Sequence, residues 1–524
     1  MKLRTIVKIA ITSSVVLLCS GFALYSFFRL SAAEGQKDFN LYELVPSTTS
    51  AVFVTDDVLE FVAEVDELTC SKNQQYLYVS KLFSYLKQSL YALSEDTPHG
   101  LSRQMNQMLI SFHEPDNERN QVLYCRLGNG DKELVNRFVR KYISSLYPPK
   151  TFIYKGEEII IYPMADGDFL ACYLTSDFMA LSFQKKLIEN VIDAYKSGKS
   201  LADDSTFTGI RAPKKSAAAA TIYTRMQGMM GWTEFDMKMK DDFIYFSGIT
   251  HDADTCFAFI NQLRQQQSVK GFPGEVLPST AFYFSRQGIT DWVSLLSYGN
   301  VQRQSVPVRT SEVQNRDKEF SRYLMENAGQ DLVACLFQRE DTLQGAAAVL
   351  SLSVADVTEA ERMLRALVSA APADEGRRNP RITFCYTVNK AYPIYRLPQT
   401  TLFEQLTSFA EPTLDVYAAF YGGRLLLAPD ADALAHYIRQ LDKGEVLNGA
   451  MVYQTGMDHL SDSYHFMLMA DFDHIFQQSE NHVRFVPDFF LRNADFFRHF
   501  TLFVQFACAD GVVYPNIVLK YKSE

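Results

Sequence analysis

Two segments of this chain recur later in the same order. The run LVPSTTSAVFVTDDVLEFVAEV begins at Leu44, and a similar run, VLPSTAFYFSRQGITDWVSLL, begins at Val276. The run FMALSFQKKLIENVIDAYKSGKSL covers residues 178–201, and a related run, GRLLLAPDADALAHYIRQLDKGEVL, covers residues 423–447. A long internal repeat restricts the chain to folds that contain one structural unit twice.

The spacing of the repeated segments shows how the two copies differ. The offset is 232 residues between Pro46 and Pro278, and 246 residues between Gly198 and Gly444. The second copy therefore has about 14 more residues than the first between this proline and this glycine. A chain of 524 residues is too long for a single core. We therefore predict repeat 1 at residues 40–270 and repeat 2 at residues 275–524.

Local patterns predict an α+β fold in each repeat, with largely antiparallel sheets. Strand-like runs are followed by an aspartate and an amphipathic helix, as in the helix after Asp356 that uses Ala360, Met363, Leu364 and Leu367. Residues 501–506 and 516–522 alternate with period two, which is typical of half-buried antiparallel strands. Polar stretches at about 301–317 and 371–380 are predicted to be loops.

The N-terminus predicts a membrane anchor. Residues 1–8 carry three basic side chains and form a predicted cytoplasmic tail. Residues 9–28 follow as 20 residues without a charge, which as a helix would span roughly 30 Å, the thickness of the hydrocarbon core. We predict an uncleaved transmembrane signal anchor, because a cleaved signal usually has a shorter apolar region. Cleavage after Ala33 remains an alternative, because small residues precede that position.

The charge distribution predicts the orientation and the location. Basic residues before the apolar span favour a cytoplasmic N-terminus, so a single-pass protein of the inner membrane with its body in the periplasm is expected. The net charge of −10 opposes nucleic acid as a partner.

Cysteine usage indicates buried thiols. Seven cysteines lie beyond the apolar span, an odd number with no CxxC pair, and five of them lie in apolar strand-like runs. Buried free thiols are expected, although a single disulfide stays possible because spacing cannot assign one.

The sequence contains none of several common catalytic or nucleotide-binding motifs. It contains no GxSxG, GxGxxG or kinase signature, and we expect no enzymatic activity and no cofactor. The alternative is an envelope hydrolase or metalloenzyme that uses the histidines and aspartates of residues 458–499, with Asp471 and His474 as the nucleus of a metal site. No catalytic residue and no metal ligand is assigned.

Aromatic and methionine side chains gather near the end of each repeat. Such residues are enriched in binding interfaces, although they also build ordinary cores. In residues 484–498 the phenylalanines alternate with charged residues, which suits a partly exposed element. The candidate partner-binding residues are Phe485, Phe489, Phe490, Phe496, Phe497, Met229, Met230 and Trp232.

The chain resembles a family of membrane-anchored bacterial envelope proteins that carry a duplicated domain of unknown function. The resemblance rests on Leu44-Val45-Pro46-Ser47 with the strand and helix that follow it. It also rests on residues 421–427 and on the helix that begins near Asp432 and ends at Gly444. It covers most of residues 40–522 and implies an envelope location, but no activity.

These observations predict a non-enzymatic protein, anchored in the inner membrane through residues 9–28, that binds or scaffolds a protein or a lipid-like partner on the periplasmic side. A carrier with an apolar tunnel between the two repeats is a third possibility.

Overall fold

A computed structural model gives the fold of the chain. It describes residues 39–72, 106–114, 119–128, 131–138, 147–164, 167–211, 218–225, 231–250, 258–290, 292–293, 295, 311–339, 346–370, 381–388, 390–407, 413–478, 486 and 488–522. The predicted tail and membrane anchor lie outside these residues. Within them, no helix is long and apolar enough to cross a membrane.

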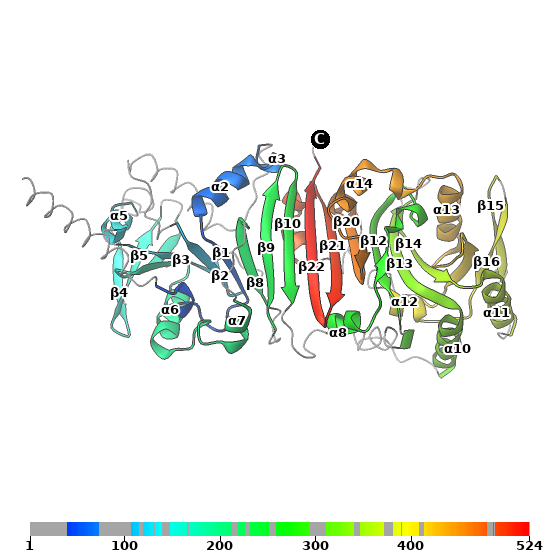
Figure 1. Cartoon of the computed structure of the whole chain (residues 1–524), viewed down its shortest axis with the longest axis horizontal. Coiled ribbons are helices and arrows are strands. Elements are labelled where there is room, and N and C mark those ends of the chain that lie inside the picture. Colours follow the sequence, from blue (N-terminus) through cyan, green and yellow to red (C-terminus); the bar gives the residue numbers. More distant parts are fainter. Residues whose placement is uncertain are drawn as a thin grey trace, which may run out of the picture.

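The fold is α+β with antiparallel strands, as the sequence predicts, but one large sheet runs through both halves instead of a separate sheet in each (Figure 1). In the first half its strands are β1 Ala51–Thr55, β2 Met108–Phe112, β3 Gln121–Arg126, β4 Lys150–Tyr154, β5 Glu157–Pro163, β6 Phe169–Leu174, β7 Phe178–Ser182, β8 Ala220–Thr224, β9 Thr233–Lys240 and β10 Phe243–Thr250. In the second half they are β12 Ala281–Gly288, β13 Ala328–Gln338, β14 Ala346–Val354, β15 Ile382–Tyr386, β16 Ala391–Arg396, β17 Tyr417–Tyr421, β18 Arg424–Ala428, β20 Phe466–Asp471, β21 Phe500–Ala509 and β22 Val512–Tyr521. A separate small sheet pairs β11 Val269–Lys270 with β19 Ser463–Tyr464.

The strand order is the same in both halves. From its outer edge, the first half runs β4-β5-β6-β7-β3-β2-β1-β8-β9-β10. The second half runs β15-β16-β17-β18-β14-β13-β12-β20-β21-β22. Every one of these pairings is antiparallel. The two halves therefore share one topology among the described strands.

The halves meet where β10 pairs with β22 in the middle of the sheet (Figure 1). Each of these strands follows a tight hairpin turn whose first residue, Asp241 or Asp510, has a positive φ of 51° or 52°. Ser247 and Asn516 occupy equivalent positions after these turns, and they lie directly opposite each other. The register is therefore symmetric, so a pseudo-twofold axis passes between the two strands.

The repeated sequence segments meet in space within each half. Pro46 forms an isolated bridge with Ser200, and Pro278 forms the same bridge with Val446. The Ser47 amide donates to the Lys199 carbonyl at 3.3 Å, and its counterpart at residue 279 donates to Glu445 at 2.9 Å. In the first half, residues 44–47 therefore hold the segment that follows the repeated helix. In the second half, residues 276–279 hold the corresponding segment in the same way.

Helices cover both faces of the sheet. One set is α2 Val58–Glu67, α3 Thr69–Lys72, α5 Asp131–Phe138, α10 Ser311–Asn327, α11 Val357–Ala370, α12 Leu402–Leu406, α15 Phe472–Phe476, α17 Asp488–Arg492 and α18 Ala494–Phe497. The others are α6 Lys185–Ser197, α7 Ser205–Ile210, α8 Ala258–Arg264, α13 Ala431–Asp442 and α14 Met451–Met457, with single 3-10 turns at Leu41–Glu43, Pro273–Val276 and Leu447–Gly449.

Alternation along the strands separates the cores on the two faces. Val52 packs in the core beneath α6 and α7, whereas its neighbour Phe53 faces the core beneath α2. In the second half, Val349 faces α13 and Leu350 faces α11. Successive strand residues point to opposite faces, so the sheet is buried on both sides.

The described cysteines are free, and the buried ones lie in these cores. Cys70, Cys125, Cys172, Cys335 and Cys385 are buried, and Cys508 is half-buried. Burial raises the pKa of the Cys125 and Cys172 thiols to about 12. These thiols therefore stay protonated and unreactive at neutral pH.

Candidate partner-binding groove

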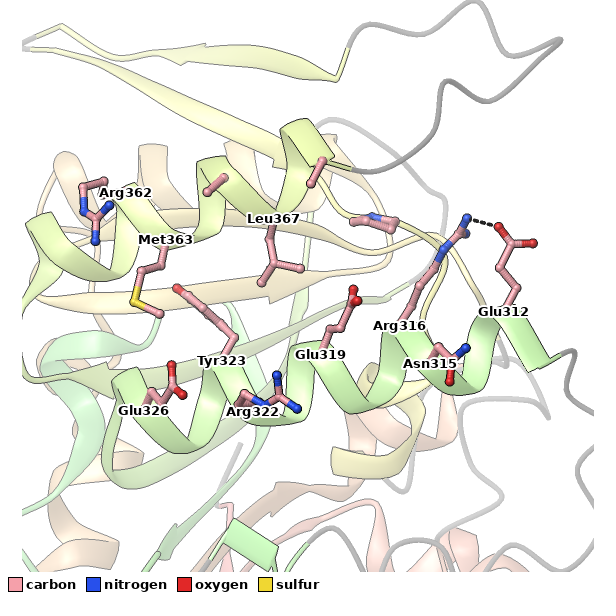
Figure 2. Close-up of a pocket in the computed structure, with 13 residues that line it drawn as sticks. Glu312, Asn315, Arg316, Glu319, Arg322, Tyr323, Glu326, Arg362, Met363 and Leu367 are labelled. Carbon is pink, nitrogen blue, oxygen red and sulfur yellow. Dashed lines mark hydrogen bonds and ion pairs between the residues drawn. The ribbon is translucent and has the colours of Figure 1, made fainter.

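A groove of about 630 Å³ lies between α10 and α11 in the second half (Figure 2). Its lining residues are Glu312, Asn315, Arg316, Glu319, Arg322, Tyr323, Glu326, Arg362, Met363, Ala366, Leu367, Ala370 and Pro398. The floor is apolar, with Met363 and Leu367 side chains that point between the two helices (Figure 2). Charged side chains from α10 line one wall.

Helix α10 is fixed to the body by the side that faces away from the groove. Val313, Phe320 and Leu324 are buried on that side. Between them Asp317, only 8% exposed, accepts hydrogen bonds from the Thr400 hydroxyl at 2.7 Å and from the Thr401 amide and hydroxyl at 2.9 and 2.7 Å. The carboxylate therefore joins α10 to the start of α12.

Helix α11 begins with a cap and is held on the sheet by its buried face. The Asp356 carboxylate accepts a hydrogen bond from the Glu359 amide at 3.1 Å, which satisfies a free donor of the first turn. Ala360, Leu364 and Val368 are buried against the sheet. Met363 and Leu367, predicted to lie in the same buried stripe, are half-buried and reach the groove instead.

Tyr323 clamps the two helices together at one end of the groove. Its hydroxyl donates to the Ala360 carbonyl at 3.1 Å. Burial raises the pKa of Tyr323 well above its ordinary value, so the hydroxyl keeps its proton and remains a donor. The separation of α10 and α11 is therefore fixed by a specific contact, and the groove is preformed.

Charges of alternating sign run along the groove wall of α10. Glu312, Arg316, Glu319, Arg322 and Glu326 follow one another at helical spacing. Arg316 pairs with Glu312 at 2.6 Å (Figure 2). Glu319, Arg322 and Glu326 are exposed and have no ion-pair partner in the part of the chain that the structure describes. These three charges are therefore available to an incoming partner.

Replacing Asp317 with alanine should lower the free energy of unfolding by about 1–3 kcal/mol, because two buried threonine hydroxyls and one amide lose their acceptor. The change should also loosen α10. Chemical denaturation with matched amide hydrogen exchange of residues 311–327 would measure both effects. Lys318→Ala, one residue along and exposed, is the control. Unchanged exchange in α10 would contradict this role for Asp317.

The described aromatic candidates near the C-terminus pack against one another and against Phe472 and Phe500. Phe485 lies outside the described residues, and the side chain of Phe489 is not described. Phe490 and Phe496 are half-buried, and Phe497 is 8% exposed. The ring centroid of Phe497 lies 4.8 Å from that of Phe490 and 5.1 Å from that of Phe496. Phe490 and Phe496 keep some exposed surface, whereas Phe497 belongs to the core.

Of the three predicted candidates in the first half, one has a described position. Met229 and Met230 lie outside the described residues. Trp232 is 1% exposed, with its ring centroid 5.0 Å from that of Phe207 and the Arg225 guanidinium 4.9 Å above it. In this structure Trp232 contributes to the core beneath α7 rather than to the surface.

Asp471 and His474 lie together, but the other described late histidines do not form a metal-ligating cluster with them, and His482 lies outside the described residues. The Asp471 carboxylate accepts from Lys522 at 2.7 Å and lies 3.3 Å from the His474 ring. His459 instead packs on Phe243, and the His465 ring accepts from the Cys508 amide at 3.1 Å. No group of three metal-ligating side chains is found within the described ranges.

No protein-family model matches this chain, and comparisons with curated proteins and with solved structures found no match either. The groove therefore has to be interpreted from its own chemistry.

Sequence reasoning missed the helix that forms the groove. Residues 301–317 were predicted to be a polar loop, but α10 begins at residue 311. A usable signal was present, because Val313, Phe320 and Leu324 recur at helical spacing. The stripe is interrupted by the charged Asp317, whose buried position depends on threonines 83 and 84 residues away in sequence.

Proposed function

We propose that this chain is a non-enzymatic, membrane-anchored envelope protein that holds a partner protein on the periplasmic side, and that an amphipathic helix of the partner binds between α10 and α11. The observation that carries the proposal is the groove itself, with its apolar floor and a wall of alternating charges. Helix-in-groove recognition uses an apolar floor of this kind.

The dimensions of the groove suit a helix. Glu312 and Glu326 are 14 residues apart along α10, which corresponds to about 21 Å, or roughly four helical turns. A partner helix of similar length would bury its apolar side chains on Met363 and Leu367. Basic side chains at its edges would face Glu319 and Glu326, and an acidic one would face Arg322.

We further propose that the two halves are tandem homologous α+β domains behind a transmembrane anchor at residues 9–28. The sequence repeat, the shared strand order and the matching Pro46 and Pro278 bridges support the duplication. The basic residues before the apolar run support the anchor and its orientation.

The double variant Met363→Glu with Leu367→Glu should reduce partner capture at least tenfold, because it places charges on the apolar floor. The size of the complex formed by the full-length protein, extracted from membranes in mild detergent, would report the loss. Met325→Glu is the matched control, because Met325 lies on α10, is 45% exposed and does not line the groove.

The control should retain the complex, and both variants should unfold at the temperature of the wild type to within a few degrees. Retention of the partner by a folded double variant would contradict the proposed site. Loss of the complex in the Met325→Glu control as well would place the contact elsewhere on α10.

A further inference from the structure

Strand β15 ends the sheet in the second half (Figure 1). It pairs with β16 on one side, and no other described strand pairs with it. At the opposite end of the sheet, β4 occupies the equivalent position beside β5. An edge strand presents unpaired amides and carbonyls that can accept another strand.

The hydrogen bonds around β15 show which of its backbone groups point outward. The Arg396 amide donates to the Arg381 carbonyl at 2.9 Å, and the Thr387 amide donates to the Lys390 carbonyl at 3.0 Å. Bonded and non-bonded pairs alternate in an antiparallel ladder. Residues 382, 384 and 386 are therefore in non-bonded pairs with β16, and their amides and carbonyls face the open edge. Pro393 lies opposite Phe384. A proline has no amide hydrogen to donate, so its place in a non-bonded pair agrees with this register.

The same three residues carry exposed apolar side chains. Ile382 is 43% exposed, Phe384 54% and Tyr386 69%, whereas Cys385, on the other face, is 1% exposed. From residue 382 to residue 389 the chain contains no charge. Natural edge strands are usually protected by lysine, proline or a bulge, and β15 has none of these.

The equivalent edge at the other end of the sheet is protected. Strand β4 begins with Lys150 and is followed by Lys155. The Lys185 ammonium lies 4.9 Å from the ring centroid of Phe152 on the same strand. The two ends of the sheet therefore differ: β4 itself contains a lysine, whereas β15 has no charged residue between the flanking Arg381 and Lys390.

We propose that β15 pairs antiparallel with β15 of a second copy of this chain. Centring the pair on Phe384 places Phe384 opposite its own counterpart and Ile382 opposite Tyr386 of the second copy. On the exposed face all cross-strand neighbours are then apolar, and no charged residue lies within either strand. The outward amides and carbonyls of residues 382, 384 and 386 form the new ladder. The junction repeats the geometry by which β10 and β22 already join the two halves.

The test is the association state of the full-length protein in mild detergent, measured by sedimentation equilibrium. The wild type should dimerise. Phe384→Pro should weaken association about tenfold or more, because it removes an outward amide and a large apolar side chain. The pairing of β15 with β16 should persist in this variant, because the backbone of residue 384 makes no hydrogen bond to β16. Phe384→Leu keeps the amide and an apolar side chain, and it should remain dimeric.

A second variant, Tyr386→Lys, tests the same edge without a backbone change and should also shift the protein toward monomer. Thermal melts of each variant confirm that the fold persists. A wild type that stays monomeric at concentrations of about 100 µM, corresponding to a very weak association, would overturn the proposal. A dimer that survives unchanged in folded Phe384→Pro would also overturn it.

Discussion

Replacing Asp331 with alanine is expected to lower the free energy of unfolding by about 3–5 kcal/mol, the cost of breaking a buried ion pair on one side. Asp331 is 6% exposed and lies between Arg286 of the adjacent strand β12 and Arg424 of β18, which lies beyond β14. Its carboxylate accepts from Arg286 Nε at 3.0 Å and from the Arg424 guanidinium at 3.3 Å. Removing the carboxylate leaves two largely buried guanidinium groups without their counter-ion.

Urea denaturation of Asp331→Ala against the wild type measures this cost. Glu359→Gln is the control, because it breaks an exposed pair in which Arg362 Nε lies 2.8 Å from the carboxylate, and such pairs contribute about 0–1 kcal/mol. A loss for Asp331→Ala no larger than for the control would show that the buried pair contributes nothing to stability.

The same carboxylate predicts a dependence of stability on pH. Burial raises the pKa of Asp331, but Arg424, the Ser353 hydroxyl and Arg286 outweigh burial and lower the pKa below its ordinary value. A depressed pKa in the folded state means that its stabilisation is present above about pH 4 and is lost as pH falls through the folded value. The stability gap between wild type and Asp331→Asn should therefore shrink on acidification below pH 4.

Gly288→Ala is expected to destabilise the fold by about 3 kcal/mol, near the upper end of the usual cost of overpacking. Gly288 ends β12, and a methyl group there would overlap the backbone carbonyl of Gln267 and lie 3.3 Å from Val269 Cγ1. The Gly288 amide also donates to the His465 carbonyl at 3.0 Å. Because backbone lies on both sides, the site cannot relax by turning a side chain.

Gly209→Ala is the matched control for this change. Gly209 lies in α7, and a methyl group there would meet nothing within 4 Å. The substitution should be neutral or should stabilise the helix by up to about 1 kcal/mol. Thermal unfolding of the two variants side by side separates a local clash from a general effect of losing glycine. Equal melting temperatures would contradict the close approach at Gly288.

The sequence was sufficient for features that depend on neighbouring residues. Helical spacing after Asp56-Asp57 predicts a buried stripe of Val58, Phe61, Val62 and Val65, and α2 has that stripe with Asp57 as its cap. The strands predicted at residues 501–506 and 516–522 lie in β21 and β22. Helical spacing predicts a buried stripe of Leu187, Ile188, Val191, Ile192 and Tyr195, and in α6 all of these are buried except Tyr195, which is 40% exposed. Periodicity and capping are local signals, and they survive without knowledge of the fold.

Features that depend on distant residues could not be predicted. The pairing of β10 with β22 joins segments 270 residues or so apart, and nothing in either strand specifies the other. The groove needs α10 and α11 side by side, which depends on Tyr323 donating to the Ala360 carbonyl and on Asp317 fixing α10 to α12, both contacts between residues far apart in the chain. Phe497 and Trp232 belong to residue types that are enriched in binding interfaces. They are buried here because helices and strands from other parts of the chain pack around them.

The measurement that tests the groove most directly is in-cell photo-crosslinking of the full-length protein from position 366, in the groove, compared with position 318. Ala366 lines the groove, whereas Lys318 is exposed on α10 outside it. A bound partner helix predicts a discrete protein adduct from position 366 that is absent from position 318 and lost in the Met363→Glu and Leu367→Glu double variant. No protein adduct from position 366, or equal adducts from both positions, would contradict a partner seated between α10 and α11.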